Sequence, residues 1–189
     1  MRRFLRKPAS ERDPLMVTMS GVRLGERALQ IGDGDARSIA LIAAKTGLTG
    51  TAAIVVADDQ AAARIQRAVT DTGALVDLRV VAEDRLPFAD ASFDAVVIHD
   101  ISAITAAGDR FTRWLRECHR LLRTGGRVVT IERGTPVGIR ALFSGKPSPP
   151  VRVGGGGPTF TALQAAGFTA IRDLADREGL RFTEGFKTN

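Results

Sequence analysis

The apolar positions of the chain follow two spacings in turn, one typical of strands and one typical of helices. The run TAAIVVADD at 51–59 is continuously apolar up to its acidic end, as in a strand buried on both faces. The stretch QAAARIQRAVTDTG at 60–73 has helical spacing and ends at a glycine, a common helix terminator. The same patterns predict strands at 27–31, 51–59, 75–84, 93–100, 126–133, 169–175 and 180–187, and helices at 36–46, 60–73, 109–126 and 159–168.

This alternation predicts an α/β fold of the open, doubly wound, Rossmann-like type, with a mainly parallel sheet and helices on both faces. Ligands of such sheets bind beyond the carboxyl ends of the strands, where the strand order reverses. We expect one domain at 25–189, preceded by a basic tail and capping segment at 1–24. Residues 134–158 are rich in glycine and proline, and we expect them to form a mobile loop or a lid.

The helix predicted at 109–126 has two contrasting sides. Its apolar residues recur at helical spacing, which predicts a face buried against the sheet, and Cys118 lies in that face as a small core residue. The other side carries a row of arginines: Arg113, Arg116, Arg120 and Arg123. We interpret this arginine row as a solvated face, with an anionic partner or a subunit contact as the alternatives.

Composition excludes several classes of protein. An apolar content of 44% and a charged content of 25% are ordinary for a globular domain. One cysteine and two histidines leave no internal disulfide and no thiolate metal cluster, so no metal site is expected. No segment reaches the about 18 apolar residues of a membrane span, and the N-terminus lacks the apolar stretch of a signal peptide. We therefore expect a cytoplasmic protein.

The net charge of +6 suggests a nucleic-acid partner, because basic side chains release counterions from phosphate. Much of the excess lies in the tail, at Arg2, Arg3, Arg6 and Lys7. The chain has no tyrosine, and it shows neither zinc-finger spacing nor an aromatic-rich RNA-binding signature. Nucleic acid is therefore disfavoured as the main partner.

The stretch ALQIGDGDARSIALIAA at 28–44 joins the first predicted strand to the first predicted helix through two glycines. A strand, a glycine turn and a helix are a common cradle for nucleotide-like cofactors. The dinucleotide spacing Gly-x-Gly-x-x-Gly/Ala is not met, because its sixth position is Arg37, whose bulk would hold helix and strand apart. Gly32, Gly34 and Ala36 form a Gly-x-Gly-x-small pattern, which by itself favours no single cofactor.

Four segments in sequence make a resemblance specific: LQIGDGDA at 29–36, VVADDQ at 55–60, EDRLPFADASFDAVVIHD at 83–100 and LRECHRLLRTGGRVVTIER at 115–133. In order and spacing they resemble the motifs of class I S-adenosylmethionine-dependent methyltransferases, most closely the branch typified by ubiquinone and menaquinone biosynthesis methyltransferases. The resemblance implies a seven-stranded sheet whose last strand is antiparallel. It also implies methyl transfer from S-adenosylmethionine to a small organic acceptor, with a homodimer as one way to close the cleft.

The resemblance assigns a role to individual residues as well. It places at the cofactor Gly32, Asp33, Gly34, Asp58, Asp59, Glu83, Asp84 and His99. The glycines would let the backbone approach the cofactor closely. Asp58, preferred over Asp59, would accept hydrogen bonds from both ribose hydroxyls, with an N-cap of the next helix as the alternative. Glu83 and Asp84 would face the adenine, with Leu86 and Phe88 beside the ring.

His99 and Asp100 are the candidate catalytic residues, since they end the strand where the methyl group and its acceptor would meet. A histidine titrates near neutral pH, so His99 is the candidate general base, and Asp100 would orient it or replace it. The alternative is that His99 lines the cofactor pocket or caps its strand.

The glycine stretch also departs from the pattern of the family, at Gln30, Asp33, Asp35 and Ala36. Gln30 stands where an acid is usual. These departures motivate a second hypothesis, a catalytically inactive relative that keeps the fold as a binding or interaction module. Nucleic-acid methylation is a third and weaker one.

Overall fold

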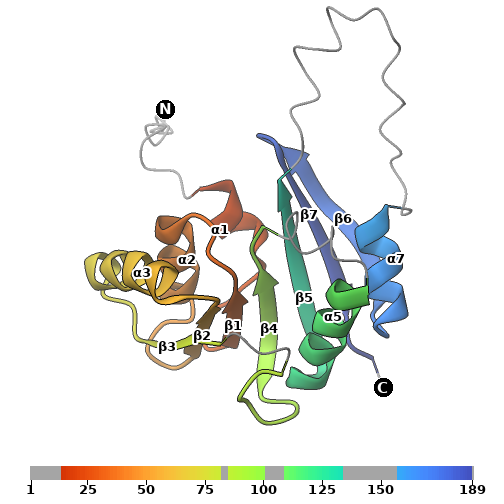
Figure 1. Ribbon diagram of the computed structural model, residues 1–189, viewed down its shortest axis with the longest axis horizontal. Coiled ribbons are helices and arrows are strands. Elements are labelled where there is room, and N and C mark those ends of the chain that lie inside the picture. The colour runs from red at the N-terminus through yellow and green to blue at the C-terminus, as the bar shows by residue number, and fades with distance from the viewer. Residues whose placement is uncertain (1–13, 82–84, 101–108, 134–156, 189) are drawn as a thin grey trace, which may run out of the picture.

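The computed structural model describes residues 14–81, 85–100, 109–133 and 157–188, which build one sheet covered by helices (Figure 1). Its strands are β1 (Arg27–Ile31), β2 (Thr51–Val56), β3 (Val76–Val80), β4 (Phe93–Ile98), β5 (Leu122–Arg133), β6 (Thr169–Arg177) and β7 (Leu180–Phe186). Its helices are α1 (Leu15–Met19), α2 (Ala36–Ala44), α3 (Asp59–Thr72), α5 (Asp109–Leu121) and α7 (Pro158–Ala165).

The seven strands lie in the order β3-β2-β1-β4-β5-β7-β6. The first five are mutually parallel, and β7 runs antiparallel to both of its neighbours. The predicted doubly wound sheet with an antiparallel last strand is therefore confirmed. Strand order reverses between β1 and β4, so this pair marks the place where ligands of open α/β sheets bind.

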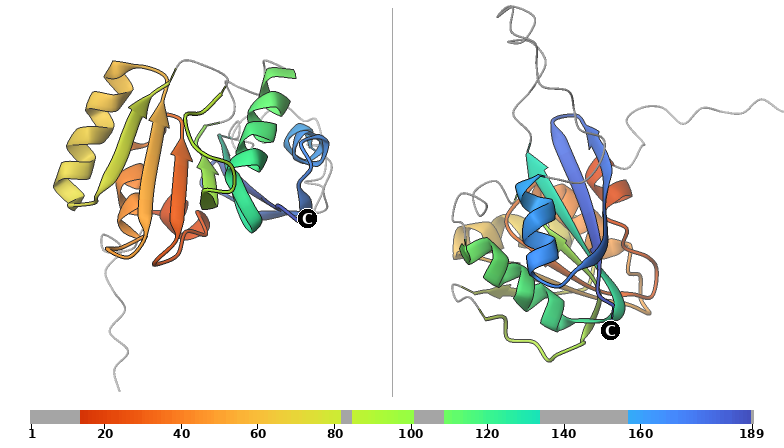
Figure 2. Two further views of the ribbon diagram at one scale, coloured as in Figure 1. Left: turned by 90° about the horizontal axis from the view of Figure 1, so that it is seen from below. Right: turned by 90° about the vertical axis from the view of Figure 1, so that its right-hand side faces the viewer.

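Strand β2 shows why its sequence is apolar throughout. Ala52, Ile54 and Val56 face α2 and α3, and Ala53 and Val55 belong to the core on the opposite face. Successive side chains of a strand point to opposite faces, so a strand covered on both sides has no solvent-facing position. The views in Figure 2 show the two helical layers on either side of the sheet.

Helix α5 buries the apolar side that its sequence predicts. Phe111, Leu115 and Cys118 are at most 3% exposed and pack in the core between α5, α7 and the sheet. Burial raises the pKa of the Cys118 thiol to about 12, so the group stays protonated and unreactive. Cys118 is a core residue, as predicted.

Two differences from the predicted elements have a clear physical origin. Strand β5 begins at Leu122 rather than at 126, and α5 ends at Leu121, because Leu122 pairs with Phe93 of β4. Main-chain bonds then tie Gly125 and Gly126 to Lys187. The Lys187 ammonium also donates to the carbonyls of His119 and Leu122, which satisfies the end of α5.

The short helix α1 was not predicted from sequence. Its single buried residue, Val17, joins a cluster with Val22, Ile131 and Phe182, so packing rather than helical periodicity stabilises this turn. The remainder of the predicted tail, 1–13, and residues 134–156 of the predicted lid lie outside the described residues. None of the described helices has the length and apolar composition needed to cross a bilayer.

Candidate functional site

The candidate site lies at the carboxyl ends of β1 and β4, where residues 32–35, here called the glycine loop, leave the sheet. Ile31 and Ile98 are register partners, so the loop begins beside His99. The His99 amide donates to the Ile31 carbonyl at 2.8 Å, and the Gly32 amide donates to the Val55 carbonyl at 3.0 Å. The loop is therefore held by main-chain bonds to the strands on both sides of β1.

The chain beneath the loop requires a glycine at position 32 and leaves little room for a side chain at position 34. Gly32 has a φ of +102°, and a Cβ placed on it would lie 2.7 Å from the His99 carbonyl oxygen. A Cβ on Gly34 would lie 3.1 Å from the Cβ of His99. The sequence explained these glycines by close approach to a ligand; the structure adds a second reason, close approach to the end of β4.

His99 is buried under the loop in a polar pair with Gln30. The histidine is 2% exposed and Gln30 is fully buried. The Gln30 amide nitrogen donates to the Ile39 carbonyl at 2.9 Å, and its oxygen lies 3.0 Å from Nε2 of His99. With its amide oriented in this way, Gln30 accepts, so Nε2 carries the proton and Nδ1 presents a lone pair.

The state of His99 follows from this environment. Burial lowers the pKa of His99 to about 4, against a smaller opposing effect of the Asp35 carboxylate. The imidazole is therefore neutral at physiological pH. Nδ1 is buried without a hydrogen-bond partner in the described part of the chain. Because the ring lies below the glycine loop, its placement favours the pocket-lining role over that of a general base.

Gln30 is the residue whose role the sequence did not reveal. It was noticed only as a departure from an acidic position, whereas the structure makes it a link between β1, β4 and α2. An amide in an otherwise apolar, doubly buried strand is the signal that could have indicated a buried polar partner.

The two aspartates of the loop are both engaged with the protein. Asp35 is the N-cap of α2, and its carboxylate accepts from the Ser38 amide at 2.8 Å and the Ser38 hydroxyl at 2.6 Å. Asp33 forms an ion pair with Arg64 of α3 at 2.9 Å. One negative charge thus stabilises a helix start, and the other faces a guanidinium.

The next strand end carries Asp58 and Asp59. Asp58 is the N-cap of α3, since its Oδ1 accepts from the Ala61 amide at 2.8 Å, and Asp59 begins the helix. This is the alternative role considered for Asp58, and ribose binding stays a prediction. Glu83 and Asp84, the residues expected at the adenine, lie outside the described residues. Leu86 is buried in the core, and Phe88 packs edge-on against Phe93.

Asp100 does not orient His99. Its carboxylate lies 3.0 Å from Nε of Arg133, so it pairs across the ends of β4 and β5. The residue has a φ of +49°, in the left-handed region that aspartate tolerates better than most residues. The two candidate catalytic residues therefore face different surroundings, a buried amide for His99 and a partly exposed arginine for Asp100.

The chain belongs to the methyltransferase domain family, whose profile matches residues 29–130, more than half of its length. Membership of this family implies S-adenosylmethionine as the cofactor. No protein with a curated description matches the chain.

Solved structures of the same fold include a SAM-dependent methyltransferase from Aquifex aeolicus, with a TM-score of 0.65 and 14% identity over 89% of this chain and 86% of that one. A SAM-dependent O-methyltransferase from Thermotoga maritima has a TM-score of 0.66 and 16% identity, and the match covers 92% of this chain and 63% of that longer chain. The [4+2]-cyclase SpnF has a TM-score of 0.63 and 17% identity, and the match covers 92% of this chain and 78% of that one. At such identities the likeness establishes the fold and leaves the activity open.

The residues present at the loop fit S-adenosylmethionine. The glycine loop lies at the point where strand order reverses, and the carboxylate of Asp58 stands at the end of the adjacent strand β2. Beneath the loop, Nδ1 of His99 is buried and has no described hydrogen-bond partner. Its lone pair can accept a hydrogen bond from a donor group placed next to it. Arg64 faces Asp33, so the loop does not present two uncompensated negative charges to the carboxylate of the cofactor.

Proposed function

We propose that the protein transfers the methyl group of S-adenosylmethionine to a small organic acceptor. The observation that carries this proposal is the glycine loop held over a neutral His99 at the reversal of strand order, in a chain of the methyltransferase family. The cofactor supplies a methyl group activated by its sulfonium, and alignment of donor and acceptor accounts for much of the rate in such a displacement. More specifically, we propose that the acceptor is a precursor of the ubiquinone or menaquinone type.

The residues of the loop and of the strand ends would divide the work. Gly32, Asp33 and Gly34 would bind the amino-acid and ribose parts of the cofactor, and Asp58 with Asp59 the ribose hydroxyls. Glu83 and Asp84 would bind the adenine. His99 would support the loop from below as a neutral group. Asp100, beside Arg133, would accept a proton where the acceptor must lose one.

Calorimetry with S-adenosylmethionine tests the proposal, and one substitution tests the ribose assignment. Asp58→Ser removes the carboxylate and keeps a side chain that caps helices well, so the free energy of unfolding should change by less than about 0.5 kcal/mol. The affinity for the cofactor should fall about tenfold or more, the scale of a charge-assisted hydrogen bond. An unchanged affinity would refute the role of Asp58, and a wild-type protein that takes up no cofactor at millimolar concentration would refute the enzyme.

The inactive binding module remains the second candidate, because the loop departs from the family pattern and Gln30, Asp33 and Asp35 are all engaged by partners within the protein. It predicts no heat with either S-adenosylmethionine or S-adenosylhomocysteine. Nucleic-acid methylation predicts instead that RNA or DNA retains the protein with a steep salt dependence.

A further inference from the structure

The arginine row of α5 divides into two pairs. Arg120 binds Glu117 at 2.6 Å and also Asp90, and Arg123 binds Asp94. Arg113 and Arg116 form no ion pair or hydrogen bond with any described side chain. Arg113, Arg116 and Arg123 are exposed, as the interpretation of a solvated face expects. Arg120 and Arg123 also bind acidic side chains of the fold, and Arg113 and Arg116 do not.

Two acids of α5 lie four residues from Arg113, Asp109 before it and Glu117 after it, and Glu117 does not pair with it. Glu117 follows Arg113 by four residues, the spacing at which helical ion pairs form. Its carboxylate is directed elsewhere, because it accepts from Arg120 at 2.6 Å and from the Leu86 amide at 2.9 Å. Those bonds from Arg120 and Leu86 keep the pKa of Glu117 low, in spite of partial burial, and no arginine from the first two turns contributes.

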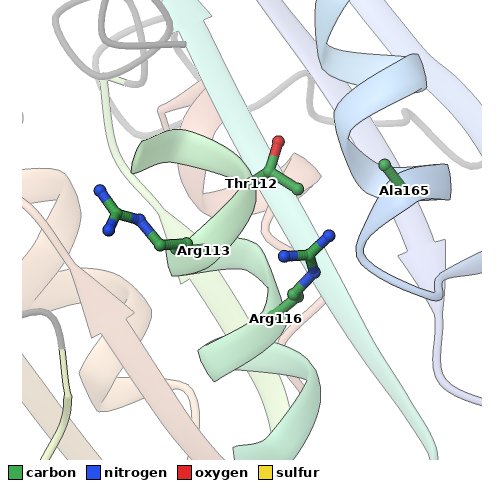
Figure 3. A pocket seen from close by; sticks show the side chains of 4 residues that line it. All are labelled: Thr112, Arg113, Arg116 and Ala165. Atoms are coloured by element: carbon green, nitrogen blue, oxygen red, sulfur yellow. The ribbon is translucent and has the colours of Figure 1, made fainter. Parts of the chain in front are cut away.

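A groove lies between α5 and α7, here called the α5–α7 groove, with Arg116 facing into it and Arg113 at its rim (Figure 3). Its volume is about 580 Å³, and its described lining is Thr112, Arg113, Arg116 and Ala165. Figure 3 shows Arg116 and Thr112 on the side of α5 that faces α7, one turn apart, with Arg113 directed to the other side. Across the groove the exposed Ala165 leaves space, since its side chain is a single methyl group.

The sequence around the groove carries an excess of positive charge. The stretches 101–116 and 134–165, which lead into and form its two helices, contain Arg110, Arg113, Arg116, Arg140, Lys146 and Arg152 against one acid, Asp109. Segments 101–108 and 134–156 contain no aspartate or glutamate at all. Neither connection can therefore supply a carboxylate to Arg116, whatever its conformation.

We propose that the α5–α7 groove binds the phosphate group of a small molecule. The guanidinium of Arg116 presents a planar fork of donors that matches an oxyanion, and the Thr112 hydroxyl, one turn away, supplies a further donor. Arg113 at the rim adds a second positive charge, which favours a dianion over a monoanion. The volume is that of a small-molecule site, and two free arginines are too few for the many phosphate contacts of a nucleic acid.

This site is separate from the glycine loop, so its test does not depend on methyl transfer. Inorganic phosphate and pyrophosphate are titrated into the full-length protein by calorimetry, with phosphate-free buffer of constant ionic strength. Arg116→Gln should weaken phosphate binding about tenfold or more, Thr112→Val about threefold to tenfold, and Arg113→Gln less than about threefold. Arg67→Gln, which removes an exposed arginine from α3, is the matched control and should leave the affinity unchanged.

Ala165→Phe distinguishes a groove from a merely positive surface. It fills the space opposite Arg116 and leaves every charge in place, so it should abolish binding if the ligand lies between the helices. Unchanged phosphate affinity in Ala165→Phe or in Arg116→Gln would overturn the proposal. So would tighter retention of an RNA oligonucleotide than of pyrophosphate, with a steep salt dependence. In each folded variant the affinity for S-adenosylmethionine should equal that of the wild type.

Discussion

The charged side chains at the glycine loop have partners within the protein, and, in the described part of the chain, those at the α5–α7 groove do not. At the loop end of the sheet, Asp33, Asp35, Asp58 and Asp100 each have a partner within the protein. In the groove, Arg113 and Arg116 have none among the described side chains. Charged residues near a cofactor loop can thus serve the fold, whereas the unpaired arginines at the groove are available for the phosphate group that we propose to bind there. Four substitutions or titrations sharpen this contrast, from the largest expected effect to the smallest.

Gly32→Ala should have the largest effect, because it combines an unfavourable φ of +102° with a Cβ only 2.7 Å from the His99 carbonyl oxygen. We expect a loss of about 3 kcal/mol or more in the free energy of unfolding, measured with urea. Gly73→Ala is the control, since Gly73 has a φ of +67° but nothing within 4 Å of its added Cβ. It should lose only about 1 kcal/mol. Equal losses would show that contact with β4 is not what requires Gly32.

His99 should make stability depend on pH between 6.5 and 4. Its pKa falls from 6.5 when unfolded to about 4 when folded, so the unfolded chain binds a proton first. The stabilisation is fully present above pH 6.5 and is lost as the pH falls toward 4, by about 3 kcal/mol in total. Urea unfolding at pH 7.5, 6 and 5 measures it, and His99→Gln should remove this part of the dependence.

His119 provides the control for that titration. Its pKa is also lowered by burial and by Lys187, but the ring is only partly buried. His119→Gln should therefore leave most of the pH dependence in place. If His119→Gln removed more of it than His99→Gln, the buried pair with Gln30 would not be its source.

Replacing arginine by glutamine should affect the free energy of unfolding much more at position 120 than at position 116. Arg120→Gln should lower the free energy of unfolding by about 2 kcal/mol, because Glu117 and the carbonyls of Leu86 and Phe88 lose their donor. Arg116→Gln should change it by less than about 0.5 kcal/mol. Thermal unfolding without phosphate measures both. A comparable loss at Arg116 would assign that residue a structural partner.

The smallest expected effect is a difference between the two aspartates of the glycine loop in their contribution to the free energy of unfolding. Asp35→Ala removes the N-cap of α2 and should lose about 1 kcal/mol. Asp33→Ala removes an ion pair whose side chains are about half exposed, and should lose less than about 0.5 kcal/mol, decreasing with added salt. Urea unfolding at low and high salt compares them. A loss at Asp35 that disappeared at high salt would contradict its role as a cap, because the bonds from Ser38 do not depend on salt in this way.

The sequence was sufficient for the seven strands and the four longer helices, though not for α1 or for the start of β5. The continuous apolar run of β2 and the divided face of α5 correctly placed a strand buried on both sides and a helix packed on one. These patterns are local, so they survive without knowledge of the fold. The position of the glycine loop at the reversal of strand order followed from the order of elements alone.

The partners of the polar side chains were decided only by the tertiary structure. Gln30 and His99 are 69 residues apart in sequence, and Asp33 and Arg64 are 31 apart. Such contacts depend on strand register and helix docking, which no local pattern encodes. The same is true of the arginine row: helical spacing predicted one polar face, but the positions of Glu117, Asp90 and Asp94 determine which arginines are neutralised and which remain for a ligand.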